Sequence, residues 1–237
     1  MKIKFHYILI LGLALVILSC KKDNYDAPAT TFNGRLVYNG EAINVENGQL
    51  FLELWQPGFG RNGAISVAVA QDGSFSSLLF DGNYKLTISN GQGPFMWKTR
   101  TDGKPDSIAL PLAGNQTLDL EVTPYYLVRN AQFTHAGGKI SSTFKVDKII
   151  ANANAKNIER VTLYVNRTQF VSGGNDNNIL QSNLAITPTT DWANVSITTG
   201  SIPVISPTQN YVFARVGVKI DGVEDMIFSP VTKVQTQ

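Results

Sequence analysis

The sequence predicts an all-β protein made of two tandem β-sandwich domains that follow an N-terminal targeting segment. Turn dipeptides recur at short spacing through the first half, the segments between them alternate apolar with polar residues, and no helical stretch fits between the turns. The dipeptides are Asn39-Gly40, Asn47-Gly48, Asn62-Gly63, Asp72-Gly73, Asp81-Gly82, Asn90-Gly91 and Asp102-Gly103. At 237 residues, the chain is long enough for two small domains with cores of ordinary size.

The first twenty residues lie outside these domains. Lys2 and Lys4 form a positive region, and Tyr7 to Leu18 is an uninterrupted apolar run that is too short to span a bilayer. The run ends in Ile17-Leu18-Ser19-Cys20, which resembles the lipobox of bacterial lipoproteins. The resemblance implies that the Cys20 thiol receives a diacylglyceryl group, that residues 1–19 are removed and that the new amino terminus is acylated.

Several acyl chains would hold the protein on the outer membrane without spanning it. The alternative is an ordinary secretory signal followed by a chance cysteine. Residues 20–27 are then expected to form a tether, and their lysine and acidic residues resemble the surface-export signal of Bacteroidetes lipoproteins. That resemblance implies the cell surface as the location, with the periplasmic face as the alternative.

The charge balance argues against a nucleic-acid partner. The chain has 20 basic and 18 acidic residues, and loss of Lys2 and Lys4 with the signal peptide leaves 18 of each. The mature chain has no basic excess to attract nucleic acid. Cys20 is the only cysteine, so no disulfide forms within the chain.

The first domain is expected at residues 28–124. Its predicted strands are Thr31–Tyr38, Gln49–Trp55, Ile65–Ala70, Gly73–Leu79, Gly82–Ser89, Asp106–Leu110 and Thr117–Val122. The order Gly34-Arg-Leu-Val, Gly48-Gln-Leu-Phe-Leu-Glu-Leu, Asp72-Gly-Ser-Phe and Leu79-Phe-Asp-Gly-Asn-Tyr84 resembles the carboxypeptidase-regulatory, prealbumin-like fold. That resemblance implies a sandwich that serves as a spacer or docking unit and carries no catalytic residues.

The second domain is expected at residues 125–237. Its predicted strands are Tyr125–Phe133, Lys139–Ile149, Arg160–Val165, Asn183–Ile186, Val195–Thr198, Tyr211–Ile220 and Met226–Val234. The stretch from Ser206 to Pro230 resembles the final strands of fibronectin type III domains, with Tyr211 as a tyrosine-corner residue. The register disagrees, because Tyr211 shares a face with Arg215 and Lys219. We therefore expect an immunoglobulin-like sandwich and leave its topology open.

The combination of a lipobox, the first sandwich and Val122-Thr-Pro-Tyr-Tyr126 leading into a second β-domain resembles an uncharacterised Bacteroidetes lipoprotein family. Its members are commonly encoded beside starch-utilisation-type glycan uptake systems. The resemblance implies a role in glycan capture or import, with an oligosaccharide or polysaccharide and an outer-membrane transporter complex as partners.

Catalytic residues are scarce. His135 is the only histidine outside the signal peptide, it is expected in a Gly-rich turn, and no nucleophile-elbow sequence accompanies it. One histidine and one lipidated cysteine cannot form a zinc site. Gly173 to Asn178 offers oxygen ligands without EF-hand spacing, so a loose calcium site there is the alternative to a surface loop. We expect no enzymatic activity, no metal and no cofactor, with a two-carboxylate glycoside hydrolase as the third hypothesis.

Aromatic residues are the candidate ligand-binding groups, because sugars stack on aromatic rings while neighbouring polar groups bind their hydroxyls. Phe95 and Trp97 lie in a Gly- and Pro-containing loop that is expected near the surface. Trp55 alternates with Leu52 and Leu54 and is expected to point outward, and Trp192 follows a second predicted loop. The alternative is that these rings pack at the sandwich ends or between the domains. The function expected first is glycan binding, and the alternative is a docking component without a ligand of its own.

Overall fold

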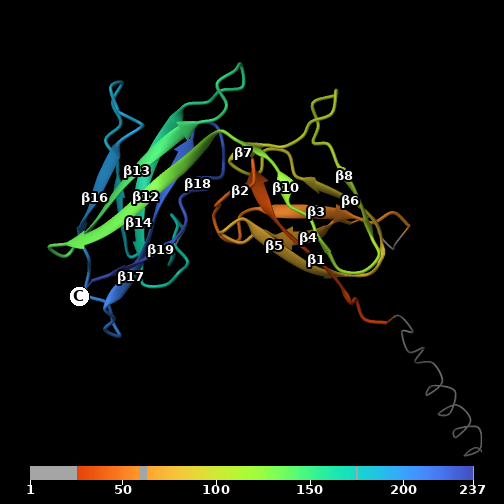
Figure 1. The fold of residues 1–237 in the computed structure, drawn as a ribbon, viewed down its shortest axis with the longest axis horizontal. Coiled ribbons are helices and arrows are strands. Elements are labelled where there is room, and N and C mark those ends of the chain that lie inside the picture. Colours follow the sequence, from red (N-terminus) through yellow and green to blue (C-terminus); the bar gives the residue numbers. More distant parts are fainter. Residues whose placement is uncertain (1–25, 59–62, 175, 237) are drawn as a thin grey trace, which may run out of the picture.

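The computed structural model describes residues 26–58, 63–174 and 176–236, and in these ranges the chain forms strands and no helix. The predicted all-β class and the two sandwich-like domains are confirmed. Figure 1 shows the domains lying one beside the other, with the described N-terminal residues and the C-terminus at opposite ends of the molecule. Cys20 lies outside the described residues. No helix long and apolar enough to cross a membrane occurs in the described ranges.

The first domain contains two facing sheets. Its strands are β1 (Thr30–Tyr38), β2 (Glu41–Ala42), β3 (Phe51–Trp55), β4 (Ile65–Ala68), β5 (Ser74–Leu79), β6 (Gly82–Ile88), β7 (Phe95–Met96), β8 (Ile108–Leu112), β9 (Gln116–Thr117), β10 (Leu120–Glu121) and β11 (Thr123–Pro124). One sheet has the order β4-β3-β6-β8. In the other, β1 pairs antiparallel with β2 and β5 and parallel with β9 and β10.

Period-two alternation places the core of this domain between the sheets. Leu52 and Leu54 of β3 are fully buried, as is Leu86 of β6, whereas Trp55 is 39% exposed. The predicted outward direction of Trp55 is therefore confirmed. Gly34 of β1 has no room for a side chain, because a Cβ there would lie 1.9 Å from the carbonyl oxygen of Leu118, in the segment between β9 and β10.

Three features of the first domain differ from the sequence prediction. The strand predicted over Thr117–Val122 is divided into β9 and β10, each paired in parallel with β1. The predicted Asp106–Leu110 strand is shifted by two residues, to Ile108–Leu112. The loop expected to hold Phe95 and Trp97 contains strand β7, which pairs antiparallel with β11.

The second domain also has two sheets. Its strands are β12 (Tyr126–Ala136), β13 (Lys139–Lys148), β14 (Ile158–Asn166), β15 (Leu180–Asn183), β16 (Val195–Ser201), β17 (Tyr211–Ile220), β18 (Ile227–Phe228) and β19 (Thr232–Gln235). One sheet has the order β12-β13-β16, and the other has β15-β14-β17-β18 with β19 also paired to β17. His135 lies in β12 opposite Ile140, at the end of a hairpin and not in its turn.

Strand β17 is buried on both faces along its middle. The five predicted apolar positions are fully buried: Val212, Ala214, Val216, Val218 and Ile220. Arg215, on the face predicted to be polar, is also 0% exposed, because Tyr164, Val171, Met226 and Phe228 form a second small core. The predicted Met226–Val234 strand is interrupted between β18 and β19, and the predicted Asn183–Ile186 strand is observed earlier, as β15.

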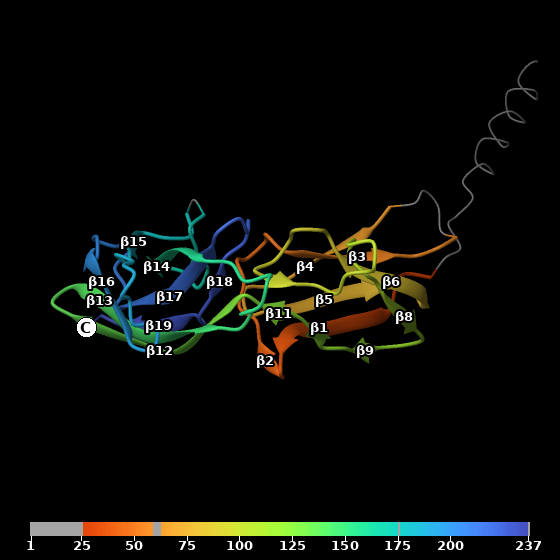
Figure 2. The same cartoon turned by 90° about the horizontal axis from the view of Figure 1, so that it is seen from above.

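The domains are joined without a spacer and make direct contacts. Only Tyr125 separates β11 from β12. Figures 1 and 2 show β2 and β18 on facing sides of the junction, where Asn44 forms an isolated β-bridge with Phe228. The Arg215 guanidinium donates to the carbonyl oxygen of Val45 in the first domain at 3.0 Å. Arg129 of the second domain forms an ion pair with Glu41 of the first.

Candidate functional site

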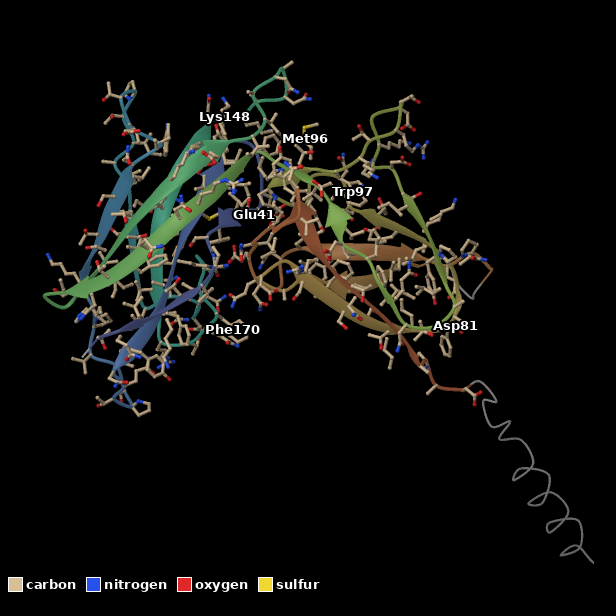
Figure 3. The ribbon with its side chains drawn as sticks, viewed as in Figure 1. Glu41, Asp81, Met96, Trp97, Lys148 and Phe170 are labelled. Atoms are coloured by element: carbon tan, nitrogen blue, oxygen red, sulfur yellow. The ribbon has the colours of Figure 1, made fainter. Side chains whose placement is uncertain are left out.

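A pocket of about 270 Å³ opens at the junction of the two domains. Its first wall comes from the chain around β7, including Gln92, Met96 and Trp97, and Figure 3 shows Met96 and Trp97 beside each other there. Its second wall includes Lys156 and Val223 of the second domain. The two walls are more than fifty residues apart in sequence, so the pocket exists only when both domains are folded and in contact.

Glycines shape the loop that forms the first wall. Gly91 and Gly93 have φ angles of 83° and 86°, a region that residues with a Cβ rarely adopt. A Cβ on Gly93 would also lie 2.3 Å from the Phe95 ring. The Gly93 N–H donates to Asp225 Oδ2 of the second domain at 2.7 Å. Burial raises the pKa of the Asp225 carboxyl, so its ionised form is stabilised less than in water.

The two aromatic residues predicted to form one platform both line the pocket, but they differ in exposure. Phe95 is only 5% exposed and belongs to the core, so little of its ring is accessible from the pocket. Trp97 is half-buried and lines the pocket. Its indole Nε1 donates to the carbonyl oxygen of Asp106 at 2.8 Å, which fixes the plane of the ring.

The second wall carries one cation, Lys156, and the pocket is also lined by Tyr125 of the linker, which is followed by Tyr126. The Tyr126 hydroxyl donates to the Lys156 carbonyl oxygen at 2.6 Å, and the Lys156 ammonium lies 5.8 Å from the centre of the Tyr125 ring. The same ammonium donates to the carbonyl oxygens of Asp221 and Gly222 at 3.4 and 3.3 Å. Burial raises the pKa of both tyrosine hydroxyls, so they remain protonated at neutral pH. Both tyrosines lie at the junction between the domains.

The other two candidate tryptophans lie elsewhere. Trp55 is on the outer face of the β4-β3-β6-β8 sheet, where its Nε1 donates to Glu53 Oε2 at 3.1 Å. Trp192 is half-buried against the core of the second domain, and its carbonyl oxygen accepts from the Val146 N–H at 2.8 Å. Trp192 does not line the junction pocket.

The chemistry of the pocket lining is that of a binding site. No Asp, Glu or His lines it, whereas hydrolysis of a glycosidic bond canonically uses two flanking carboxyl groups. Hydrogen-bonding groups are supplied by Ser89, Asn90, Gln92, Thr99 and Lys156. Within the described ranges, no group of three or more His, Cys, Asp or Glu side chains is placed to hold a metal ion.

Sequence reasoning identified Trp97 but missed the second wall of the pocket. Lys156 lies in an Asn-rich segment between two predicted strands, and Gly222 lies between two others. Loop residues have no periodic pattern that could reveal which distant segment they face. The one signal in the sequence for contact between the domains is that the predicted domains abut at Pro124 and Tyr125, with no Gly- or Ser-rich spacer between them.

Comparison with known proteins gives the chain a family. Residues 30–123 match the N-terminal domain of a protein family of unknown function, DUF3823, and residues 126–233 match the DUF3823 C-terminal domain, also of unknown function. A comparison with curated proteins finds no match.

Several solved structures are similar over most of their length. A DUF3823 family protein from Bacteroides ovatus is 33% identical with a TM-score of 0.73, covering 88% of this chain and 100% of that one. A family member from Parabacteroides merdae is 32% identical with a TM-score of 0.73, covering 89% and 100%. A Bacteroides uniformis protein described as a "putative carbohydrate binding protein" is 15% identical with a TM-score of 0.66, covering 88% and 100%, and this likeness shows the fold. The predicted resemblance to an uncharacterised family with Bacteroidetes members is confirmed: the chain belongs to the DUF3823 family.

Proposed function

We propose that this protein binds glycans without transforming them, as a lipid-anchored accessory to a polysaccharide uptake system. The observation that carries the proposal is the junction pocket, which combines a fixed indole ring with hydrogen-bonding side chains and has no carboxyl or imidazole group in its lining. The description of the Bacteroides uniformis neighbour supports the same ligand class.

The geometry suits a sugar for two reasons. The face of Trp97 offers apolar surface to the C–H groups of a pyranose ring, while Asn90, Gln92 and Lys156 offer partners for its hydroxyls. The pocket volume of about 270 Å³ lies just below the usual range for small-molecule sites, about 300–1,000 Å³, so it encloses only part of an oligosaccharide.

Affinity electrophoresis tests the ligand class. The chain from Lys21 to Gln237, which contains every described residue, is run through gels that contain plant, host or microbial polysaccharides. Retardation by one glycan class that is lost in Trp97→Ala supports the proposal. Trp192→Ala is the matched control, because it removes a half-buried tryptophan outside the pocket and is expected to keep the retardation.

If no polysaccharide in a broad panel retards the protein, glycan capture by this chain alone is refuted. The remaining hypothesis is then a docking component of the uptake complex. Immunoprecipitation from solubilised outer membranes separates this case, since a docking component co-purifies with an outer-membrane transporter whether or not glycan is present.

The membrane anchor is a separate part of the proposal and has its own test. Cys20 would carry the acyl chains, and Thr30 at the start of β1 lies ten positions further along the chain. A fully extended chain of that length reaches about 35 Å at most, so the first domain would stay close to the bilayer. Cys20→Ser is expected to move the protein from the membrane to the soluble fraction. Protease treatment of whole cells distinguishes the cell surface from the periplasmic face.

A further inference from the structure

The outer face of the β4-β3-β6-β8 sheet is exposed and carries a patterned set of polar and aromatic side chains. On β3, Glu53 and Trp55 point away from the core, and on β6 Lys85 and Thr87 do the same. In the sheet register Glu53 is opposite Thr87 and Trp55 is opposite Lys85. These four side chains therefore form two adjacent cross-strand pairs on one surface.

Two indole rings are hydrogen-bonded to this surface. The Trp55 Nε1 donates to Glu53 Oε2 at 3.1 Å. The Trp97 Nε1 donates to the Asp106 carbonyl oxygen at 2.8 Å, and the Thr87 hydroxyl donates to the same oxygen at 2.8 Å. Thr87 and Glu53 are register partners, so Trp97 is held next to Thr87 of this pair, and Trp55 follows Glu53 by two residues along β3.

The surface is continuous with the junction pocket. Ser89 lines the pocket, and its hydroxyl donates to the Glu53 carboxylate. Ser89 directly follows β6 and lies four positions after Lys85, the partner of Trp55, which at strand spacing is about 13 Å. Along the strands the order is therefore the pocket at Ser89, then the Thr87–Glu53 pair beside which Trp97 is held, and then Trp55.

We propose that the pocket and this surface are one extended site that binds an oligosaccharide along its length, with sugar rings on Trp97 and Trp55. The proposal rests on the glycan-binding function proposed above. Both rings are already held in position by their N–H groups, so little side-chain freedom is lost on binding. The Glu53 carboxylate, which accepts from Ser89 and Trp55, keeps lone pairs that can accept sugar hydroxyls between the two rings.

The proposal makes a prediction about ligand length. A single sugar ring is shorter than the separation between the pocket rim and Trp55, so it contacts Trp97 or Trp55 but not both. A longer oligosaccharide reaches both rings, and affinity is expected to rise with chain length until the ligand spans the surface. Internal segments of a polysaccharide should bind as well as its ends, because the outer face of the sheet is open along β6.

The test uses a disaccharide and a hexasaccharide of the polysaccharide that retards the protein, with affinities measured by isothermal titration calorimetry. Trp55→Ala is expected to weaken hexasaccharide binding about tenfold, as loss of one central aromatic contact does, and to leave disaccharide binding unchanged. Trp97→Ala is expected to weaken both. Trp55→Phe keeps an aromatic face and should restore most of the affinity for the hexasaccharide.

Phe170→Ala is the matched control. Phe170 is 42% exposed, similar to Trp55, and Figure 3 shows it well away from Trp97. The Phe170→Ala variant is expected to bind both ligands with the affinity of the unmodified chain. Thermal unfolding midpoints verify that every variant is folded.

The outcomes separate this proposal from the one on which it rests. If Trp97→Ala abolishes binding while Trp55→Ala leaves hexasaccharide affinity unchanged, the pocket binds sugar and the extended site is refuted. If the unmodified chain binds the hexasaccharide no more tightly than the disaccharide, the extended site is also refuted. If the unmodified chain binds neither ligand, the glycan-binding function itself fails, and the extended site with it.

Discussion

Replacing Asp225 with alanine tests whether the pocket depends on the contact between the domains. Asp225 belongs to the second domain, and its Oδ2 accepts a hydrogen bond from the N–H of Gly93, in the loop that leads to Trp97. This bond fixes the first wall of the pocket to the second domain. Its loss should therefore lower both the stability of the protein and its affinity for a glycan.

The expected loss of stability follows from three contributions. The bond to the ionised carboxylate, 2.7 Å long, is worth about 1.5–3 kcal/mol, and the buried Gly93 N–H would be left without its acceptor at a cost of about 1–3 kcal/mol. Removing a partly buried carboxylate returns some of its desolvation energy. We expect a net destabilisation of about 2 kcal/mol, which lowers the unfolding midpoint of a chain of this size by about 6 °C.

Differential scanning calorimetry at pH 7 measures this midpoint, and Asp225→Asn is the matched variant because its amide oxygen can still accept from Gly93. Desolvation raises the pKa of Asp225 in the folded protein above its ordinary value of 3.8. The folded state therefore binds the proton more readily than the unfolded state, and this group's contribution to stability decreases as the pH rises through that interval. Asp225→Asn lacks this titration, so its midpoint should rise relative to the unmodified protein as the pH increases from below 3.8 to 7.

An Asp225→Ala midpoint equal to that of the unmodified chain would refute the reasoning, because the hydrogen bond would then contribute nothing to stability. An Asp225→Ala variant that is destabilised but keeps full glycan affinity would show that the Gly93 contact supports the fold without positioning Trp97.

Further predictions concern the core and the junction. Gly34→Ala is expected to lower the free energy of unfolding by about 3 kcal/mol, because the new Cβ would lie 1.9 Å from the Leu118 carbonyl oxygen. Urea denaturation measures this change. A smaller shift of the urea midpoint than that of an alanine variant at an exposed strand position would contradict the prediction. Arg215→Met leaves the carbonyl oxygens of Val45 and Val171 without a donor, and relief of the buried guanidinium only partly offsets this, so we expect a loss of about 2 kcal/mol. An unchanged or higher unfolding midpoint would show that the buried charge costs more than its two hydrogen bonds contribute.

Local alternation predicted much of the fold and one end of the candidate site. Trp55 was expected to point outward because Leu52 and Leu54 alternate with it, and the structure has all three in those positions. Alternation follows from strand geometry alone, so it can be read without knowing the partner strand. The same reasoning identified the fully buried face of β17, from Val212 to Ile220.

Features that depend on distant partners could not be predicted. Phe95 was expected near the surface because Gly and Pro surround it, but pairing of β7 with β11 places its ring in the core. Arg215 was expected on a polar face, yet Phe228 packs against its guanidinium, 3.7 Å from the ring centre, and Val45 of the other domain accepts its hydrogen bond. In each case a segment far away in sequence decides the environment of the side chain.

The buried environment of Arg215 also changes the pKa of its guanidinium. Desolvation lowers its pKa to about 9, and the guanidinium still carries its charge at neutral pH. Its Nε donates to the carbonyl oxygen of Val171 in the second domain, and its Nη1 donates to that of Val45 in the first domain. Arg215, which the sequence predicts on a solvent-exposed strand face, therefore forms a contact between the domains.

The most direct test of the central claim is a crystal structure of the chain from Lys21 to Gln237 with a hexasaccharide of the polysaccharide that retards it. We expect a sugar ring stacked on the Trp97 indole in the junction pocket, with the oligosaccharide continuing past Glu53 to Trp55. Sugar bound at another surface, with the pocket empty and Trp97 making no contact, would contradict it.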